Sequence, residues 1–261
     1  MDERLDLPPP APRFYVGLDL GQVTDPTAIL VIEQRLLPPL TDPRPLSFVE
    51  RMGLGPTRKA QTPTPEATYA IIHVERLLGV SYVDQVAHVA TLLDQLRRRL
   101  VARVDPVTRR EIPPDDVALV LDRTGVGRAV SDLFAARSLP GVQVVPTTIT
   151  AGFEAGPADG GMRCPKRDLV GAVATVLQRW RLKVHPDLPL AATLTEELKN
   201  FRITYTATGH ARYEAGGDAL SWREQPHDDL VLATSLAVWW GERNLGGGRM
   251  IAAFEEAACR W

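Results

Sequence analysis

One segment near the start of the sequence, Phe14 to Gly21, restricts the fold more than any other. Apolar side chains stand at every second position, which is typical of a strand whose two faces meet different surroundings. The other face carries a single carboxylate, Asp19, between Gly17 and Gly21, so another group can approach the acid closely. A desolvated charge in mid-strand must be paired, hydrogen-bonded or bound to a cation. The alternative is an edge strand on which Asp19 faces water.

Length and composition predict one large domain with appendages. A chain of 261 residues with 44% hydrophobic content can bury one large core. We expect a flexible tail at 1–13, a folded domain at 14–245 with a proline-rich insertion or loop at 36–64, and a C-terminal tail at 246–261. No signal peptide and no run of membrane-spanning length is present in the sequence, which favours a soluble, cytoplasmic protein without a membrane partner.

Cysteine usage and charge exclude several classes of protein. Cys164 and Cys259 stand far apart and lack the spacing of a zinc site, so both are expected to be free thiols. The net charge of −2 argues against a protein that coats nucleic acid through overall positive charge. A local basic surface can still contact phosphates.

The periodicity of the remaining sequence predicts an α/β protein. The glycine-rich stretch 149–163 is expected to be a flexible loop and 203–214 an auxiliary hairpin. Further strands are expected at 28–33, 69–77, 117–121, 142–146 and 183–185, and helices at 81–99, 129–136, 165–181, 190–201 and 230–240.

Helical spacing also predicts which side chains face the core. Val83, Leu177 and Trp180 fall on apolar stripes and are expected to point inward. Glu196 and Glu197 are expected to face solvent.

A second carboxylate follows a buried strand. The apolar run 117–121 stops at Asp122, and the turn 123–127 with two glycines then precedes a helix and another strand. Strand, glycine turn, helix and strand form a βαβ unit. A carboxylate at the C-terminal end of such a strand lies where α/β sheets bind their ligands.

Two further aspartates, Asp228 and Asp229, stand at the start of an apolar helix, where free amide groups favour anions. A cap needs one aspartate, so the pair is either a cap with a first-turn charge or a cation site. Lys166 and Arg167 stand in the first turn of another helix, where the dipole disfavours cations. This placement indicates that they answer an anion.

Together, the aspartates form a set of oxygen ligands drawn from three separate segments. Oxygen ligands without His or Cys suit hard cations. Two Mg2+ or Mn2+ ions about 3.5–4 Å apart can hold the attacking and leaving oxygens of a phosphodiester in line. Because clustered carboxylates repel one another, at least one should have a raised pKa without metal, and the site should be loose. The set comprises Asp19, Asp122, Asp228 and Asp229.

Several segments, in their order and spacing, resemble the nuclease domain of bacteriophage large terminase subunits, of the RNase H-like (retroviral integrase) superfamily. The similarity covers about residues 14–243, and its most specific parts are the Asp-Arg-Thr-Gly-Val-Gly segment and the His-Asp-Asp-Leu helix start. The matching segments are Gly17–Gly21 with Asp25–Ala28, Val120–Gly127, Glu197–Phe201 and His227–Leu230.

The resemblance implies an RNase H-like mixed central sheet flanked by helices, with an auxiliary hairpin. It implies metal-dependent endonucleolytic cleavage of double-stranded DNA during genome packaging. It also implies that the main ligands of the two Mg2+ or Mn2+ ions, and the catalytic groups, are Asp19, Asp122 and Asp228, with Asp229 in support.

The resemblance further implies that the 152–163 loop, Arg163, Lys166 and Arg167 lie close to DNA. The partners it brings are double-stranded DNA, a separate packaging ATPase, a small terminase and a portal, in the cytoplasm of a host cell. The sequence has no GxxxxGK[ST] phosphate loop, so we expect a nuclease without the packaging motor.

Three alternatives stay open. A Holliday-junction resolvase or another RNase H-like nuclease would use a similar carboxylate set. Asp-Leu-Gly after a first strand also resembles the phosphate loop of actin-like nucleotide-binding proteins, although the chain lacks a later Gly-Gly adenosine motif. The third alternative is a non-catalytic packaging module that keeps the fold.

Overall fold

The structure is a computed structural model. At 103–104, 111–112, 200–205 and 211–215 it describes the backbone alone. The expected tails and the proline-rich insertion fall almost wholly outside the described residues, as does Cys259, so the domain boundaries stay a prediction. The residues described are 12–21, 25–37, 66–100, 103–104, 111–112, 117–205, 211–215 and 228–245.

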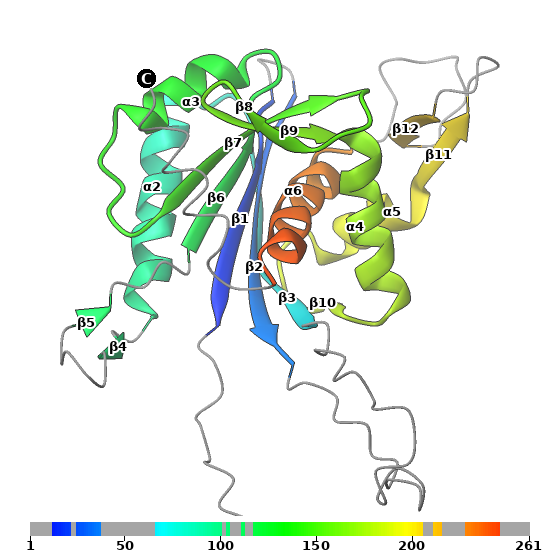
Figure 1. The fold of residues 1–261 in the computed structure, drawn as a ribbon, viewed down its shortest axis with the longest axis horizontal. Coiled ribbons are helices and arrows are strands. Elements are labelled where there is room, and N and C mark those ends of the chain that lie inside the picture. The colour runs from blue at the N-terminus through cyan, green and yellow to red at the C-terminus, as the bar shows by residue number, and fades with distance from the viewer. Residues whose placement is uncertain are drawn as a thin grey trace, which may run out of the picture.

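One mixed sheet organises the described residues (Figure 1), and its strand order is β10-β3-β2-β1-β6-β7-β9-β8. β1, β2 and β3 are antiparallel neighbours, whereas β6, β7 and β9 continue from β1 in parallel. The strands are β1 (Arg13–Asp19), β2 (Thr27–Leu36), β3 (Ala67–Leu77), β6 (Val117–Asp122), β7 (Gln143–Thr150), β8 (Gly156–Ala158), β9 (Gly161–Pro165) and β10 (Leu182–Val184).

Helices cover both faces of this sheet, with α2 and α3 on one side and α4, α5 and α6 on the other (Figure 1). Two small hairpins, β4–β5 (Arg103–Val104 and Glu111–Ile112) and β11–β12 (Phe201–Tyr205 and Ala211–Ala215), lie outside the sheet. No helix in the described part of the chain is long and apolar enough to cross a bilayer. The helices are α2 (Tyr82–Arg98), α3 (Gly127–Ala135), α4 (Lys166–Gln178), α5 (Ala191–Asn200) and α6 (Asp229–Arg243).

The alternation in β1 separates two hydrophobic cores. Phe14, Val16 and Leu18 pack in the core beneath α2 and α3. Tyr15, on the opposite face, belongs to the core shared with α4 and α6. α6 is apolar almost all round because it is buried against β1, β2 and α4, which agrees with the rule that such helices are interior.

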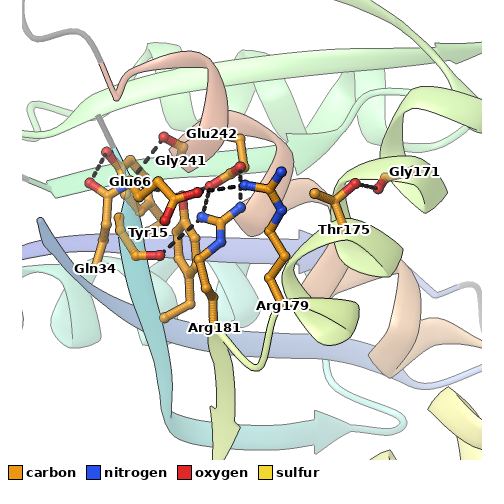
Figure 2. A network of polar contacts seen from close by, with 11 residues as sticks. Tyr15, Gln34, Glu66, Gly171, Thr175, Arg179, Arg181, Gly241 and Glu242 are labelled. Atoms are coloured by element: carbon orange, nitrogen blue, oxygen red, sulfur yellow. Dashed lines mark hydrogen bonds and ion pairs between the residues drawn. The ribbon is translucent and has the colours of Figure 1, made fainter. Parts of the chain in front are cut away.

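A polar network fixes the C-terminal end of α6 to the sheet (Figure 2). Gln34 on β2 accepts a hydrogen bond from Tyr15 at 3.3 Å and donates one to the carbonyl of Gly241 at 3.0 Å. Arg181, which is 5% exposed, donates two hydrogen bonds of 2.7 Å to Glu242. Buried polar groups are stable only when they are satisfied in this way, so the network fixes the position of α6.

The expected flexible loop at 149–163 is wrong in part. Its first residues extend β7, and its last residues form the antiparallel hairpin of β8 and β9 at the sheet edge. Asp159-Gly160 makes the turn, with Gly160 at a φ of +64°. Because Gly161 lies against the Pro146 carbonyl, where a Cβ would stand 2.1 Å from the oxygen, glycines here permit strand pairing rather than flexibility.

Three side chains expected in the core are exposed instead. Trp180 is 87% exposed because α4 ends at Gln178 and the chain reverses with Trp180 at a φ of +55°, which turns Arg181 inward. Leu177 is also exposed. Val83 lies in the first turn of α2 and is 65% exposed.

Candidate metal and nucleic-acid site

Asp19 and Asp122 lie next to each other at the C-terminal ends of two neighbouring strands. We call this end of the sheet the acidic edge. Each aspartate is the last residue of its strand, and the two strands are parallel neighbours with Leu18 opposite Leu121. The carboxyl ends of parallel strands are where α/β sheets bind ligands. The alternative of an edge strand is wrong, because β1 lies between β2 and β6.

The turn after Asp122 holds its carboxylate through the backbone. The N–H of Thr124 donates to Asp122 Oδ1 at 2.8 Å. Gly125 adopts a φ of +63°, which glycine tolerates without strain. Gly127 begins α3 so close to β6 that a Cβ would lie 2.0 Å from the carbonyl oxygen of Asp122. Both glycines of the motif are therefore required by backbone geometry.

The start of α6 brings the other two aspartates to the same edge. Asp228 is the N-cap residue, but its side chain accepts no capping hydrogen bond from the helix. The carboxylate of Asp228 is therefore not used as a helix cap. Asp229 follows in the first turn and is 8% exposed.

Asp229 is held by an arginine of β3. Arg76 Nε donates to Asp229 Oδ2 at 2.8 Å, and Arg76 Nη2 donates to Oδ1 of the same carboxylate. Arg76 Nη2 also donates to Glu197 on α5. The guanidinium therefore joins β3, α5 and α6, and the expectation that Glu197 faces solvent is wrong, since Glu197 is 7% exposed.

The four aspartates form one electrostatic unit. Burial raises the pKa of Asp19 well above its usual range, and the charges of Asp122, Asp229 and Asp228 raise it further, while Lys166 opposes them. Burial also raises the pKa of Asp122, against hydrogen bonds from Thr124 and the charge of Lys166. The prediction that at least one carboxylate has a raised pKa is confirmed.

The spacing of this acidic unit is open. In the described part of the chain, no group of three His, Cys, Asp or Glu side chains is placed to hold a metal ion. The donor chemistry and the charge nevertheless fit a hard divalent cation, because the four side chains offer only carboxylate oxygens and carry excess negative charge.

The basic side chains expected near DNA lie on β9 and in the first turn of α4. Lys166, in the first turn of α4, is near enough to lower the pKa of both Asp19 and Asp122, which agrees with its expected role of answering an anion. Arg163 on β9 is exposed, but it alternates with Met162 and Cys164 of the α4/α6 core, so its side chain lies on the opposite face of the sheet from Asp19 and Asp122. Arg167 stacks over the ring of Phe153, with its Cζ 4.6 Å from the ring centroid, and donates to the Phe153 carbonyl, so part of its role is to fix the β7–β8 loop.

The glycines on either side of Asp19 serve the protein itself. A Cβ at Gly17 would lie 1.9 Å from the carbonyl oxygen of Ala233 in α6, and one at Gly21 would lie 2.1 Å from that of Asp25. The close approach predicted beside Asp19 therefore occurs, and the approaching groups are α6 and the β1–β2 turn.

Sequence reasoning missed Arg76, Glu197 and Arg123 as parts of this edge. Arg123 donates to the carbonyl of Asp159 and so holds the β8–β9 turn beside the site. The Asp-Arg-Thr-Gly motif contained a signal for Arg123 but none for its partner. Arg76 stands opposite Ala28, and Ala28 opposite Asp19, so only the strand register reveals that Arg76 belongs here.

Comparison with known proteins shows similarity to phage large terminase subunits. No family model matches the sequence. The terminase large subunit of Thermus virus P23-45 is 25% identical over 170 residues, which make up 65% of this chain and 26% of that protein. The terminase large subunit of Thermus phage G20c matches equally well. The chain thus spans about a quarter of the length of the curated relatives it matches.

Solved structures give the same picture. A mutant nuclease domain of the large terminase subunit gp2 of bacterial virus Sf6, with manganese and beta-thujaplicinol, has a TM-score of 0.54 over 87% of each chain at 11% identity. The large terminase nuclease of thermophilic phage G20c with bound magnesium is 20% identical and has a TM-score of 0.49, covering 88% of this chain and 82% of that one. The first likeness confirms the RNase H-like fold, and the sequence relatives confirm the resemblance to large terminase subunits.

Proposed function

We propose that this chain is a divalent-metal-dependent endonuclease that cuts double-stranded DNA, as the nuclease part of a viral genome-packaging machinery. One observation carries the proposal: Asp19, Asp122, Asp228 and Asp229 reach one end of the sheet from three distant segments, and the charges of the other three all act on Asp19. A structural role does not require four acids there, because their mutual repulsion costs stability.

The acidic set suits two Mg2+ or Mn2+ ions held by Asp19, Asp122 and Asp228, with Asp229 in support. Bound ions of this kind supply a hydroxide nucleophile at neutral pH and neutralise charge on the phosphate. Asp19 lies at the centre of the set, since the charges of the other three all act on it. In the described residues no three of these side chains are placed to hold an ion, so metal binding requires a cation to draw the carboxylates together.

The chain's own residues would orient the DNA. Lys166 lies beside the acids at the start of α4 and can contact a phosphate next to the scissile bond, and Arg163, exposed on the other face of β9, can contact the duplex farther along. Arg167 supports the loop that carries Phe153. Contacts of this kind fix the register of the duplex without reading its sequence.

The sequence relatives, which are phage large terminase subunits, support a role in phage DNA packaging. We assign as partners a packaging ATPase, a small terminase and a portal, in the cytoplasm of the host cell. The nuclease would then act on the DNA that the motor supplies.

Digestion of supercoiled plasmid tests the proposal. Wild type should nick and linearise the plasmid with Mg2+ or Mn2+ and leave it intact with EDTA. Asp19→Asn and Asp122→Asn should abolish cutting, whereas Asp187→Asn, which changes an 87% exposed carboxylate, should cut like wild type. Undiminished cutting by either of the first two variants would contradict the assignment. Cleavage of four-way junctions in preference to linear duplex would favour a resolvase instead.

A further inference from the structure

We infer that Arg76 is a positioning residue, whose guanidinium holds Asp229 in place beside Asp19 while Glu197 anchors the guanidinium from α5. The inference rests on the proposed function, because it concerns the same acidic edge. It adds to the site a cation that the sequence pattern does not predict.

The strand register aligns Arg76 with Asp19 across the sheet. Asp19 pairs with Ala28 on β2, and Ala28 pairs with Arg76 on β3. Residues paired across neighbouring strands point to the same face, and strands are about 4.8 Å apart, so the Cα atoms of Arg76 and Asp19 are roughly 10 Å apart. Ala28 between them is small and fully buried, which leaves the space above it to other side chains.

Asp229 is the member of the acidic set that Arg76 contacts. Arg76 binds it in a fork, with Nε at 2.8 Å from Oδ2 and Nη2 on Oδ1. The side chains of Arg76 and Asp229 are 20% and 10% exposed, so the pair is largely desolvated and its geometry is fixed. The charge of Asp229 still acts on Asp19.

The fork leaves Asp229 able to bind a cation. A carboxylate has about four lone-pair positions, and the guanidinium uses two of them. Outer partners that orient carboxylate ligands tune metal affinity in this way, and their loss typically weakens binding by about 10–100-fold. Arg76 is therefore suited to hold Asp229 in one orientation and to offset the charge of four clustered acids.

A second arginine–carboxylate fork supplies the matched comparison. Arg181 binds Glu242 through two hydrogen bonds of 2.7 Å at the opposite end of α6, in the network of Figure 2. Both pairs are buried and both tie α6 to the strands, but only Arg76 reaches the acidic edge. A purely structural role would make the two arginines equivalent toward metal.

The test compares Arg76→Lys with Arg181→Lys, because lysine keeps the charge and removes the fork. Binding of Mn2+ is measured by titration calorimetry and by the Mn2+-dependent rise of Tm, with Tm in EDTA as the measure of stability. We expect both variants to lose Tm in EDTA. Arg76→Lys should weaken Mn2+ binding by about 10-fold or more, and Arg181→Lys should bind Mn2+ like wild type.

A second variant, Glu197→Gln, removes the negative charge that anchors the guanidinium and leaves Asp229 unchanged, so it should weaken Mn2+ binding in the same direction but less. Equal Mn2+ affinity in wild type, Arg76→Lys and Arg181→Lys would reduce Arg76 to a structural ion pair and overturn the inference alone. No Mn2+ response in wild type would overturn the proposed function together with it.

Discussion

The carbonyl of Ala233 lies directly over the Cα of Gly17, so closely that a Cβ at Gly17 would stand 1.9 Å from the carbonyl oxygen. Gly17 is in the middle of β1, two residues before Asp19, and Ala233 is one turn after Asp229 in α6. This contact between backbones brings the start of α6 to the end of β1. The geometry of the candidate site therefore depends on a residue that has no side chain.

Gly17→Ala should lower stability because neither backbone can move without disturbing a core. The expected cost is about 3 kcal/mol, typical of severe overpacking, which corresponds to a fall in Tm of roughly 6–12 °C. Gly171→Ala is the control: Gly171 lies in α4 with open space where its Cβ would be, so alanine should stabilise the helix by about 0.5–1 kcal/mol. Thermal unfolding of both variants is the measurement. Equal Tm values for Gly17→Ala and Gly171→Ala would contradict the close contact.

Asp19→Asn should make the metal-free protein more stable near neutral pH. Burial and the neighbouring acids raise the pKa of Asp19, so the folded protein keeps that proton to higher pH than the unfolded chain does. Stability of wild type in EDTA should therefore fall as pH rises above about 4, the ordinary pKa of an aspartate. The variant lacks this loss, and its Tm should exceed that of wild type by a few degrees at pH 8. A lower Tm of the variant at pH 8 would contradict the electrostatic picture.

Glu242→Gln should lower the stability of the protein near neutral pH, the opposite of the effect expected for Asp19→Asn. Despite burial, hydrogen bonds from Arg181 and Tyr69 lower the pKa of Glu242, so its ionised form stabilises the fold above the ordinary carboxyl pKa. At pH 7 the variant leaves Arg181 buried without its anion, at a cost of about 3 kcal/mol. The difference from wild type in urea unfolding should shrink as pH falls below about 4.3, since wild type then loses the same charge. A difference that stays constant with pH would show that the ion pair contributes nothing through its charge.

Arg163→Ala should weaken DNA binding for all sequences alike. Phosphate contacts carry no sequence information, and loss of one should reduce the slope of log affinity against log salt by about 1. The measurement uses duplex DNA and the Asp19→Asn background, so that cutting does not interfere. Arg98→Ala, on an exposed residue of α2, is the control. Equal losses in both variants would place the DNA elsewhere.

Sequence pattern alone predicted the elements whose residues repeat with a clear period. β1 and β6 were predictable because alternation or a continuous apolar run marks a strand. Asp122 was expected at the end of its strand, whereas Asp19 was expected in mid-strand and is the last residue of β1. The two aspartates at the start of α6 were predictable because an apolar helix follows them in the sequence. The RNase H-like architecture then followed from the resemblance, and the nuclease domain of Sf6 gp2 confirms it.

Features set by register and by chain reversal were not predictable. Arg76 and Glu197 meet because three strands align Arg76 with Asp19 and because α5 turns one face to α6. Trp180 is exposed and Arg181 is buried because α4 ends two residues before Trp180. The β8–β9 hairpin had an overlooked signal, since Asp-Gly is typical of a two-residue hairpin turn.

Anomalous diffraction from crystals grown with Mn2+ tests the central claim most directly, because it locates the ions without reference to activity. We predict two peaks at the sheet edge, with at least one within about 2.0–2.5 Å of carboxylate oxygens of both Asp19 and Asp122. Crystals at saturating Mn2+ with no anomalous density between these two carboxylates would contradict the account.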